Sequence, residues 1–300
     1  MKNYRVAITA IALMHVCAQA QTRTMSLAYQ VTHVDQGSPA ISPDGKKMLY
    51  VAVIAGVEEL FTMNLDRSGS TQITHASGNH ENPLWSPDGK RIVYSSDKNG
   101  RSAIYVSNAD GGEEERLSDD RYEYIHPSWS PDGSKVIYCS TDDLHPPQKN
   151  PSEIFSLDLK TRKVQTLITG GVNTYPALSP DGKKIAFRRI IGDMNSEVFL
   201  ANSDGTDQRN LTNNRAYDGW PAWSPDGSRI AFASNRNGNH RIFVMNADGS
   251  NVRPLAPTEG RATEPRWSPD GKTIYFSNCA SVAWGTDCQV FAAEADHSAP

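Results

Sequence analysis

One tetrapeptide, Ser-Pro-Asp-Gly, occurs six times in this chain of 300 residues. Successive copies are separated by 44, 44, 49, 45 and 44 residues. A period of about 40–45 residues is typical of propeller blades built from four strands. The copies begin at Ser42, Ser86, Ser130, Ser179, Ser224 and Ser268. This spacing predicts an all-β chain that folds as a six-bladed β-propeller of four-stranded antiparallel blades.

The second repeat shows how one blade is encoded. Its tetrapeptide predicts a turn, because proline presets the first dihedral angle, the Asp side chain bonds nearby backbone and glycine accepts a positive φ. Apolar and β-branched runs around the turn predict strands. These strands are expected at Asn82–Ser86, Arg91–Ser95, Ala103–Ser107 and Glu115–Ser118. Four strands joined by tight turns make one antiparallel sheet, so each repeat is one blade.

The two ends of the chain are complementary. Only 32 residues follow Ser268, which leaves room for three strands. Near the N-terminus, Tyr29–His33 is similar to Thr71–His75, the expected outer strand of the first repeat. We therefore expect the N-terminal strand to complete the last blade and close the ring, which removes exposed sheet edges. The predicted propeller domain covers residues 26–296.

Residues 1–20 have the features of a signal peptide. Lys2 and Arg5 precede a short apolar run, and the small residues Ala18 and Ala20 mark a cleavage site. The apolar run is too short to span a bilayer, and no later stretch is apolar enough to do so. We expect a periplasmic or secreted protein, cleaved near Ala20, without a membrane span.

The balance of charge argues against a nucleic-acid partner. The formal net charge is −4, and loss of Lys2 and Arg5 with the signal peptide changes it to −6. The sequence contains no patch of Lys and Arg that would hold phosphates. Nucleic-acid binding is therefore not expected.

Three of the four cysteines follow the expected cleavage site, and an exported protein meets an oxidising compartment. Cys279 and Cys288 flank one loop and should lie on facing strands, so we predict a disulfide; two unpaired buried thiols are the alternative. Cys139, within an apolar run, is interpreted as a core residue. Cys17 would suit a lipoprotein only after a small residue, and Val16 does not fit. No Cys or His cluster has the spacing of a metal site.

The tetrapeptide belongs to a longer pattern, Pro-x-Trp-Ser-Pro-Asp-Gly. Four copies carry its tryptophan: Trp85, Trp129, Trp223 and Trp267. With this pattern the chain resembles the propeller domain of the TolB family over roughly residues 26–296, which implies the propeller fold and a place in the cell envelope. TolB has a separate α/β domain before its propeller, and the resemblance does not extend to that domain. We interpret the repeated Asp as a turn residue and the repeated Trp as inter-blade core.

The residue before each signature proline is expected at the mouth of the central channel, because the inner strand of each blade lines that channel. Residues that only filled the channel would tend to repeat, whereas this set combines acidic, imidazole, aromatic, amide and hydroxyl groups. The six residues are Ser38, Asn82, His126, Tyr175, Trp220 and Glu264. We interpret the ring as a ligand funnel; a plug of water-bridged contacts is the alternative.

Two longer loops are expected on the same face, at Asp142–Ser152 and Asn278–Asp287. The second loop carries Trp284 and is restrained by the predicted disulfide. An exposed tryptophan on a restrained loop is typical of a contact with a protein or a sugar. The alternative is that Trp284 folds back on its own blade.

The favoured function is a non-catalytic binding module. It would recognise an envelope protein, a peptide or a glycan through the channel mouth. The aromatic residues of the mouth and Trp284 would supply contact area, while His126, Glu264 and Asn82 would supply polar specificity. The fold alone does not choose among these ligands.

The alternative function is a lyase or hydrolase acting in the same funnel. His126 beside Glu264 or Glu81 would form an acid/base pair, with the carboxylate orienting the imidazole. A calcium ion held by Glu264, Asn82 and Asp218 would suit such an enzyme, although Ca²⁺ prefers about six oxygen ligands and the ring has few carboxylates. No other cofactor is expected. The sequence contains no Gly-x-Ser-x-Gly motif.

Overall fold

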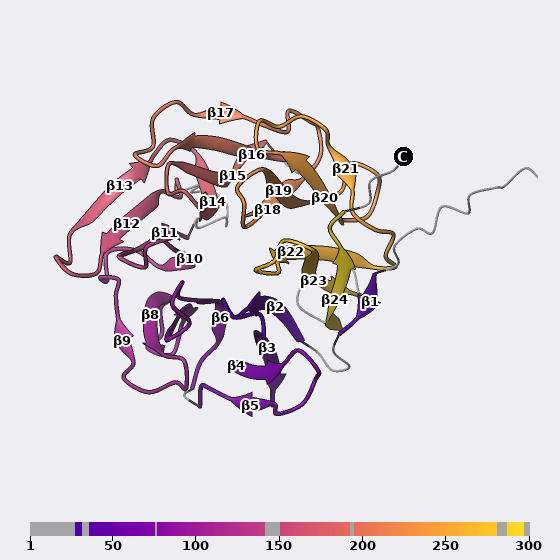
Figure 1. Ribbon diagram of the computed structural model, residues 1–300. Helices are drawn as coiled ribbons and strands as arrows, with labels where there is room; N and C mark the ends of the chain where they lie inside the picture. The colour runs from indigo at the N-terminus through magenta and orange to yellow at the C-terminus, as the bar shows by residue number, and fades with distance from the viewer. Residues whose placement is uncertain are drawn as a thin grey trace, which may run out of the picture.

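The computed structural model describes residues 28–31, 36–75, 77–141, 151–192, 195–280 and 287–296. They form six four-stranded antiparallel sheets arranged as blades around a central axis (Figure 1). The all-β six-bladed propeller predicted from the repeat is therefore confirmed. No part of the described chain forms a helix with the length and hydropathy of a membrane span. The expected signal peptide and Trp284 lie outside the described residues.

The strands follow one another from the inside of each blade to its outer edge. The strands of blades 1 to 3 are β2 (Gln36–Ile41), β3 (Lys47–Ile54), β4 (Val57–Asn64), β5 (Thr71–Gln72), β6 (His80–Trp85), β7 (Arg91–Ser96), β8 (Ala103–Asn108), β9 (Glu115–Arg116), β10 (Tyr124–Trp129), β11 (Lys135–Ser140), β12 (Ile154–Asp158) and β13 (Val164–Ile168). The strands of blades 4 to 6 are β14 (Val172–Leu178), β15 (Lys184–Gly192), β16 (Asn195–Asn202), β17 (Arg209–Asn210), β18 (Asp218–Trp223), β19 (Arg229–Ser234), β20 (Arg241–Asn246), β21 (Arg253–Pro254), β22 (Arg261–Trp267), β23 (Thr273–Cys279) and β24 (Cys288–Glu294).

The ring is closed by β1 (Tyr29–Gln30), which is the outer strand of blade 6. Tyr29 lies opposite Ala292 in β24, and the N–H of Val31 donates to the carbonyl of Val290 at 2.6 Å. The last blade thus takes three strands from the C-terminus and one from the N-terminus, as the complementary ends predicted. With the ring closed in this way, every blade packs against another blade on each side.

The signature turns have the same geometry in all six blades. In each turn the Ser hydroxyl donates to the Asp carboxylate at 2.6 Å, and the same carboxylate oxygen accepts the N–H two residues further on. The Gly has a φ between 68° and 71°. These hydrogen bonds lower the pKa of each Asp, for example that of Asp132 to about 2. The interpretation of the six Asp residues as turn residues is confirmed.

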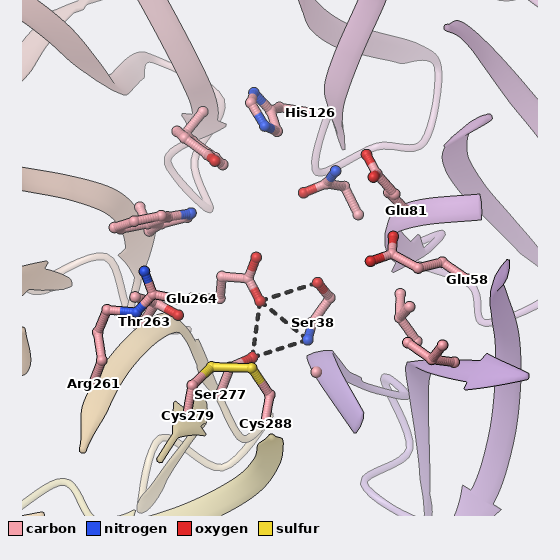
Figure 2. A pocket seen from close by; sticks show the side chains of 16 residues that line it. Ser38, Glu58, Glu81, His126, Arg261, Thr263, Glu264, Ser277, Cys279 and Cys288 are labelled. Carbon is pink, nitrogen blue, oxygen red and sulfur yellow. Dashed lines mark hydrogen bonds between the residues drawn. A yellow bond between two sulfur atoms is a disulfide. The ribbon is translucent and has the colours of Figure 1, made fainter. Parts of the chain in front are cut away.

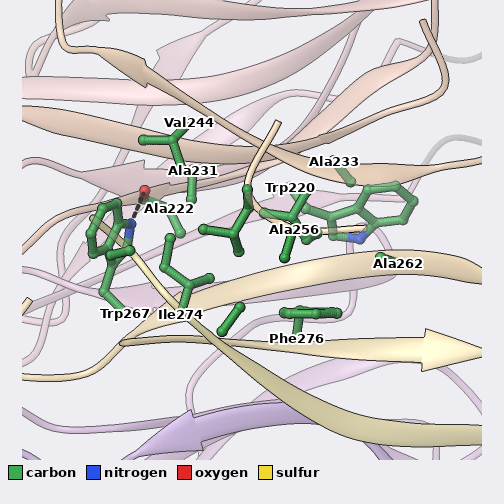
Figure 3. Packing of buried hydrophobic residues seen from close by; sticks show 14 residues of the cluster. Trp220, Ala222, Ala231, Ala233, Val244, Ala256, Ala262, Trp267, Ile274 and Phe276 are labelled. Carbon is green, nitrogen blue, oxygen red and sulfur yellow. Dashed lines mark hydrogen bonds between the residues drawn. The ribbon is translucent and has the colours of Figure 1, made fainter. Parts of the chain in front are cut away.

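The core lies between neighbouring blades. In blades 2, 3, 5 and 6 the second strand is buried along nearly its whole length, because a blade packs on each side of it. In the cluster between blades 5 and 6, small residues such as Ala231 and Ala262 leave room for Trp220 and Phe276 (Figure 3).

The signature tryptophans join adjacent blades. The indole N–H of Trp267 donates to the carbonyl of Ala222 in the preceding inner strand at 3.0 Å (Figure 3). Trp85, Trp129 and Trp223 make the equivalent bond to Ala40, Leu84 and Ala177. A buried carbonyl without a hydrogen-bond donor destabilises the fold. Each indole N–H supplies that donor to a carbonyl of the preceding blade. The expectation that these residues are inter-blade core is confirmed.

Candidate functional site

Each inner strand contains a β-bulge at the residue before the signature proline. The pairing register shifts there in all six blades. That residue has a φ between 49° and 55° in every blade, a backbone conformation that non-glycine residues rarely adopt. A bulge re-aims a side chain, so the fold itself turns six different side chains toward one place.

All six of these residues line one cavity of about 250 Å³ at one end of the channel (Figure 2). We call it the mouth cavity. It is lined by the ring predicted from the sequence, namely Ser38, Asn82, His126, Tyr175, Trp220 and Glu264, and also by Glu58, Glu81, Arg261, Ser277 and the Cys279–Cys288 pair, among others. The sequence thus located the ring, and the structure adds the residues that surround it.

One side of the mouth cavity is an arc of aromatic rings. His126 stacks on Tyr175 with 3.6 Å between ring centroids, and Tyr175 lies 5.3 Å from Trp220. Tyr217 packs 5.3 Å from Trp220 behind the ring. The guanidinium carbon of Arg188 lies 4.3 Å from the Tyr217 ring centroid, a cation–π contact. Blades 3, 4 and 5 therefore present flat, mainly apolar surfaces to a ligand.

His126 is held in this arc as a neutral ring. Burial, followed by the charges of Arg188 and Arg266, lowers its pKa to about 3. Its Nδ1 lies 3.4 Å from the Sγ of Cys139. Within the described residues, no hydrogen bond or ion pair joins His126 to Glu264 or Glu81. The two carboxylates proposed from the sequence as its acid/base partners therefore do not orient this imidazole.

Glu264 links the first and last blades across the opposite side of the cavity. One of its oxygens, Oε2, accepts from the Ser38 N–H at 3.0 Å, the Ser38 hydroxyl at 3.0 Å and the Ser277 hydroxyl at 2.8 Å (Figure 2). The Ser277 hydroxyl also accepts from the Ser38 N–H at 2.9 Å. Ser277 was missed in the sequence; it is the register partner of Thr263, next to Glu264, on β23.

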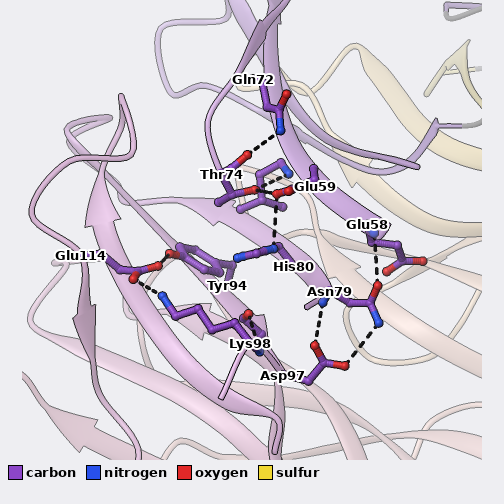
Figure 4. Close-up of polar contacts among 12 residues, drawn as sticks. Glu58, Glu59, Gln72, Thr74, Asn79, His80, Tyr94, Asp97, Lys98 and Glu114 are labelled. Atoms are coloured by element: carbon purple, nitrogen blue, oxygen red, sulfur yellow. Dashed lines mark hydrogen bonds and ion pairs between the residues drawn. The ribbon is translucent and has the colours of Figure 1, made fainter. Parts of the chain in front are cut away.

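Two further carboxyl groups, Glu58 and Glu81, lie together on the blade 1 and 2 side (Figure 2). Burial raises the pKa of Glu81, the charges of Asp97 and Glu264 act in the same direction, and a hydrogen bond with Glu58 opposes them. Glu58 is positioned by its backbone N–H, which donates to Asn79 at 3.1 Å (Figure 4). Sequence reasoning missed Glu58, because its place over the mouth depends on the length of the β3–β4 hairpin.

His80, the neighbour of Glu81, belongs to a different cluster. It is fully buried, and its Nδ1 lies 3.4 Å from the Glu59 carboxylate, which also accepts the Thr74 hydroxyl (Figure 4). Burial lowers the pKa of His80 and the Glu59 charge raises it. His80 is thus an inter-blade core residue and not part of the mouth.

The predicted disulfide is present. Cys279 on β23 is bonded to Cys288 on β24, and the two are register partners. Both residues line the mouth cavity beside Ser277. Cys139, expected in the core, is buried. The disulfide fixes the ends of the two strands that carry one wall of the cavity.

The calcium trio considered from the sequence is not brought together. Asp218 is fully buried, pairs with Arg236 at 2.9 Å and does not line the mouth cavity, unlike Glu264 and Asn82. In the part of the chain that the structure describes, no group of three or more His, Cys, Asp or Glu side chains is placed to hold a metal ion.

Two hairpins are longer than the others. Strands β3 and β4 have eight residues each, and β15 and β16 have nine and eight, whereas β7, β8, β19 and β20 have six. At about 3.4 Å per residue, two more residues extend a hairpin by about 7 Å. Among the described residues near the ends of these hairpins, Ile54 is 49% exposed and Ile191 is 50% exposed. Blades 1 and 4 are opposite in the ring, so these hairpins flank the mouth from two sides.

The six sheets, each with a bulged inner strand, define a six-bladed β-propeller with a cavity at the mouth of its channel. The chain matches the family model described as the TolB beta propeller domain over residues 10–170 and 146–296. It therefore belongs to the TolB β-propeller family. No curated protein sequence matches it.

Several solved structures are similar to this chain. A putative TolB from Agrobacterium tumefaciens superposes with a TM-score of 0.68 and 24% identity, covering 87% of this chain and 91% of that one. TolB from Acinetobacter baumannii gives a TM-score of 0.66 and 26% identity, covering 78% of this chain and 57% of that one. An oligogalacturonate lyase in complex with manganese gives 0.60 and 17%, covering 91% and 96%. At this identity the lyase shows the shared fold alone.

Proposed function

We propose that this chain is an exported binding module that holds a peptide segment of a partner protein in the mouth cavity. The observation that carries the proposal is the convergence of six chemically different side chains on one cavity, each aimed by the same bulge. The scaffold repeats six times, whereas the side chains at the mouth differ from blade to blade. The mouth is therefore the place for specificity.

The chemistry of the mouth cavity fits a peptide. The aromatic arc offers Tyr175 as a flat surface for aliphatic or aromatic side chains, and Trp220, buried in the core between blades 5 and 6, supports it from behind. The other side offers Asn82 and the carboxylates of Glu58 and Glu81 to amide or ammonium donors. The hairpins of blades 1 and 4, with their exposed isoleucines, extend the contact area beyond the cavity, which a small ligand would not need.

Export is the second part of the proposal. The signal-like N-terminus predicts it, and the Cys279–Cys288 disulfide is consistent with an oxidising compartment. The similarity to TolB structures supports a periplasmic or secreted location. The predicted cleavage near Ala20 is checked by N-terminal sequencing of the protein recovered from the periplasmic or extracellular fraction.

The experiment is a selection of peptides from a random display library against the purified chain, followed by calorimetric titration of the selected peptides. Tyr175→Leu and Asn82→Ala should each weaken binding at least about tenfold, since both residues line the cavity. Tyr122→Ala is the matched control, because Tyr122 is an exposed tyrosine that does not line the cavity. Peptides that bind wild type and both cavity variants equally would refute the proposed site, and selective capture of oligosaccharides would favour a glycan ligand.

An enzyme acting in the same cavity is the second candidate, favoured by one observation. The raised pKa of Glu81, beside Glu58, is what a general acid requires. His126 lacks a partner carboxylate, so Glu81 is the better acid candidate. The similarity to oligogalacturonate lyase suggests oligogalacturonates as the first substrates to try. The absorbance of unsaturated products would measure the reaction. Activity abolished by Glu81→Gln, with binding retained, would support this candidate over the binding module.

A further inference from the structure

The channel has a second layer of side chains below the mouth ring. In each inner strand, the residue two positions after the mouth residue lies closer to the signature turn. These six residues are Ala40, Leu84, Ser128, Ala177, Ala222 and Arg266. All but Ala40 line a second cavity of about 270 Å³, which also includes Pro180 and Pro225 of the signature turns. We call it the turn-side cavity.

The turn-side cavity contains one cation that has no ion pair within the described residues. Arg266 is the only charged residue among those that line it. Its guanidinium donates one hydrogen bond, from Nη1 to the neighbouring Pro265 carbonyl at 3.1 Å. Within the described residues no carboxylate lies within 4 Å of it. Burial lowers the pKa of Arg266, and the charge of Glu264 opposes this. A guanidinium has five N–H donors, and this bond uses one of them.

A second polar group stands across the axis from Arg266. Ser128 is only 8% exposed, and its hydroxyl has no hydrogen-bond partner in the described part of the chain. It lies on β10 of blade 3, whereas Arg266 lies on β22 of blade 6. Blades 3 and 6 are three steps apart in a ring of six, so they face each other. Buried hydroxyl groups normally have a partner, and Ser128 is among the residues that line the turn-side cavity.

The wall formed by the signature segments has few free hydrogen-bonding groups. Prolines have no N–H group, and Pro127, Pro176 and Pro221 all line the cavity. The indole N–H groups of Trp223 and Trp267 are already bonded to backbone carbonyls. At the turn end of the cavity a ligand meets the Arg266 cation, Ser128 and apolar surface, and at the other end it meets residues of the mouth ring.

We propose that the turn-side cavity binds a small organic carboxylate, with its charge on Arg266 and Ser128 and its apolar part against the prolines and tryptophans. The planar guanidinium matches a carboxylate in a two-point hydrogen bond. A single guanidinium suits a monoanion; a phosphate dianion would require more donors. Asn82, His126, Tyr175 and Trp220 line both cavities, whereas Arg266 and Ser128 line the turn-side cavity and not the mouth cavity. Variants of Arg266 and Ser128 therefore test this proposal without testing the peptide site.

The experiment is calorimetric titration of the purified chain with acetate, benzoate, phosphate and chloride, together with tryptophan fluorescence. Benzoate is expected to bind more tightly than acetate and to change the fluorescence, because Trp223 and Trp267 line the cavity. Arg266→Gln should abolish binding, and Ser128→Ala should weaken it about three- to tenfold. Tyr122→Ala, at an exposed residue that lines neither cavity, is the control that should bind as wild type does.

Each alternative result overturns the proposal. If neither carboxylate binds, Arg266 serves only as a structural counter-charge to Glu264. If chloride and phosphate bind as well as benzoate, the site recognises charge and not a carboxylate. Should Arg266→Gln fail to fold, Arg266→Lys keeps the charge and loses the planar fork. Benzoate affinity unchanged in both Arg266→Lys and Ser128→Ala would then refute the assignment.

Discussion

Replacement of Glu264 by Gln tests whether the mouth also holds the ring closed. Its Oε2 accepts three hydrogen bonds, two from Ser38 in blade 1 and one from Ser277 in blade 6. Ser38 and Glu264 are 226 residues apart in sequence. At the outer edge of the same blade, β1 contributes only two residues. The carboxylate therefore links blades 1 and 6 on the channel side, in addition to the apolar cluster packed between these blades.

The expected loss follows from these contacts. A hydrogen bond to a charged group contributes about 1.5–3 kcal/mol, and a neutral one about 1 kcal/mol. Gln keeps one acceptor oxygen but loses the charge, and the site is only partly buried. Glu264→Gln should thus lower the free energy of unfolding by about 1–2 kcal/mol. Ser277→Ala removes one donor to Glu264 and one acceptor for the Ser38 N–H, and should cost about 1 kcal/mol.

The assay is equilibrium unfolding in urea for wild type, both single variants and the double variant. If Glu264 and Ser277 act through their mutual bond, the losses are not additive, with a coupling energy of at least about 0.5 kcal/mol. Additive losses, or a Glu264→Gln variant as stable as wild type, would refute the view that this carboxylate links the blades.

Two further predictions concern the ring and the blades. His126 has a pKa of about 3 when folded and about 6.5 when unfolded, so the unfolded state binds more protons between these values and stability falls as pH decreases below about 6.5. Between pH 7 and pH 4.5 the free energy of unfolding of wild type should fall by about 2–3 kcal/mol more than that of the His126→Asn variant. Equal pH dependence of the two proteins in urea titrations would contradict a buried neutral imidazole. Gly205 has a φ of 88°, and a Cβ there would lie 1.8 Å from the Leu167 carbonyl oxygen, whereas Gly100, at 86°, has nothing within 4 Å. Gly205→Ala should destabilise by about 3 kcal/mol or more and Gly100→Ala by about 1 kcal/mol or less, and similar losses in the two variants would show that the inter-blade contact is unimportant.

Much of the fold was predictable because its determinants are local. A Ser-Pro-Asp-Gly turn needs only its own residues to form, and the period between turns fixes the number of strands per blade. The disulfide was predictable for the same reason, since Cys279 and Cys288 flank one hairpin. The ring of mouth residues was located by its constant place before the signature proline.

The contacts within the site were less predictable. Nothing near His126 in the sequence indicates that it stacks on Tyr175, and the expected pairing with Glu264 or Glu81 does not occur. Glu58 reaches the mouth because its hairpin is two residues longer per strand than most, a difference that matters only once the blade is placed in the ring. Asp218 was expected near the mouth, but the alternation of side chains along β18 directs it to Arg236 instead.

The sequence by itself determined the number of blades, the turns that end each inner strand and the six positions at the mouth, because each depends on residues close together in the chain. Only the tertiary structure decided which of those side chains touch. Two contacts connect different blades: the link from Glu264 to Ser38 and the pair of Glu58 and Glu81. Arg266 and Ser128 lie on opposite blades. Their geometry is set by closure of the ring, which brings together residues whose separation in sequence carries no information about their distance in space.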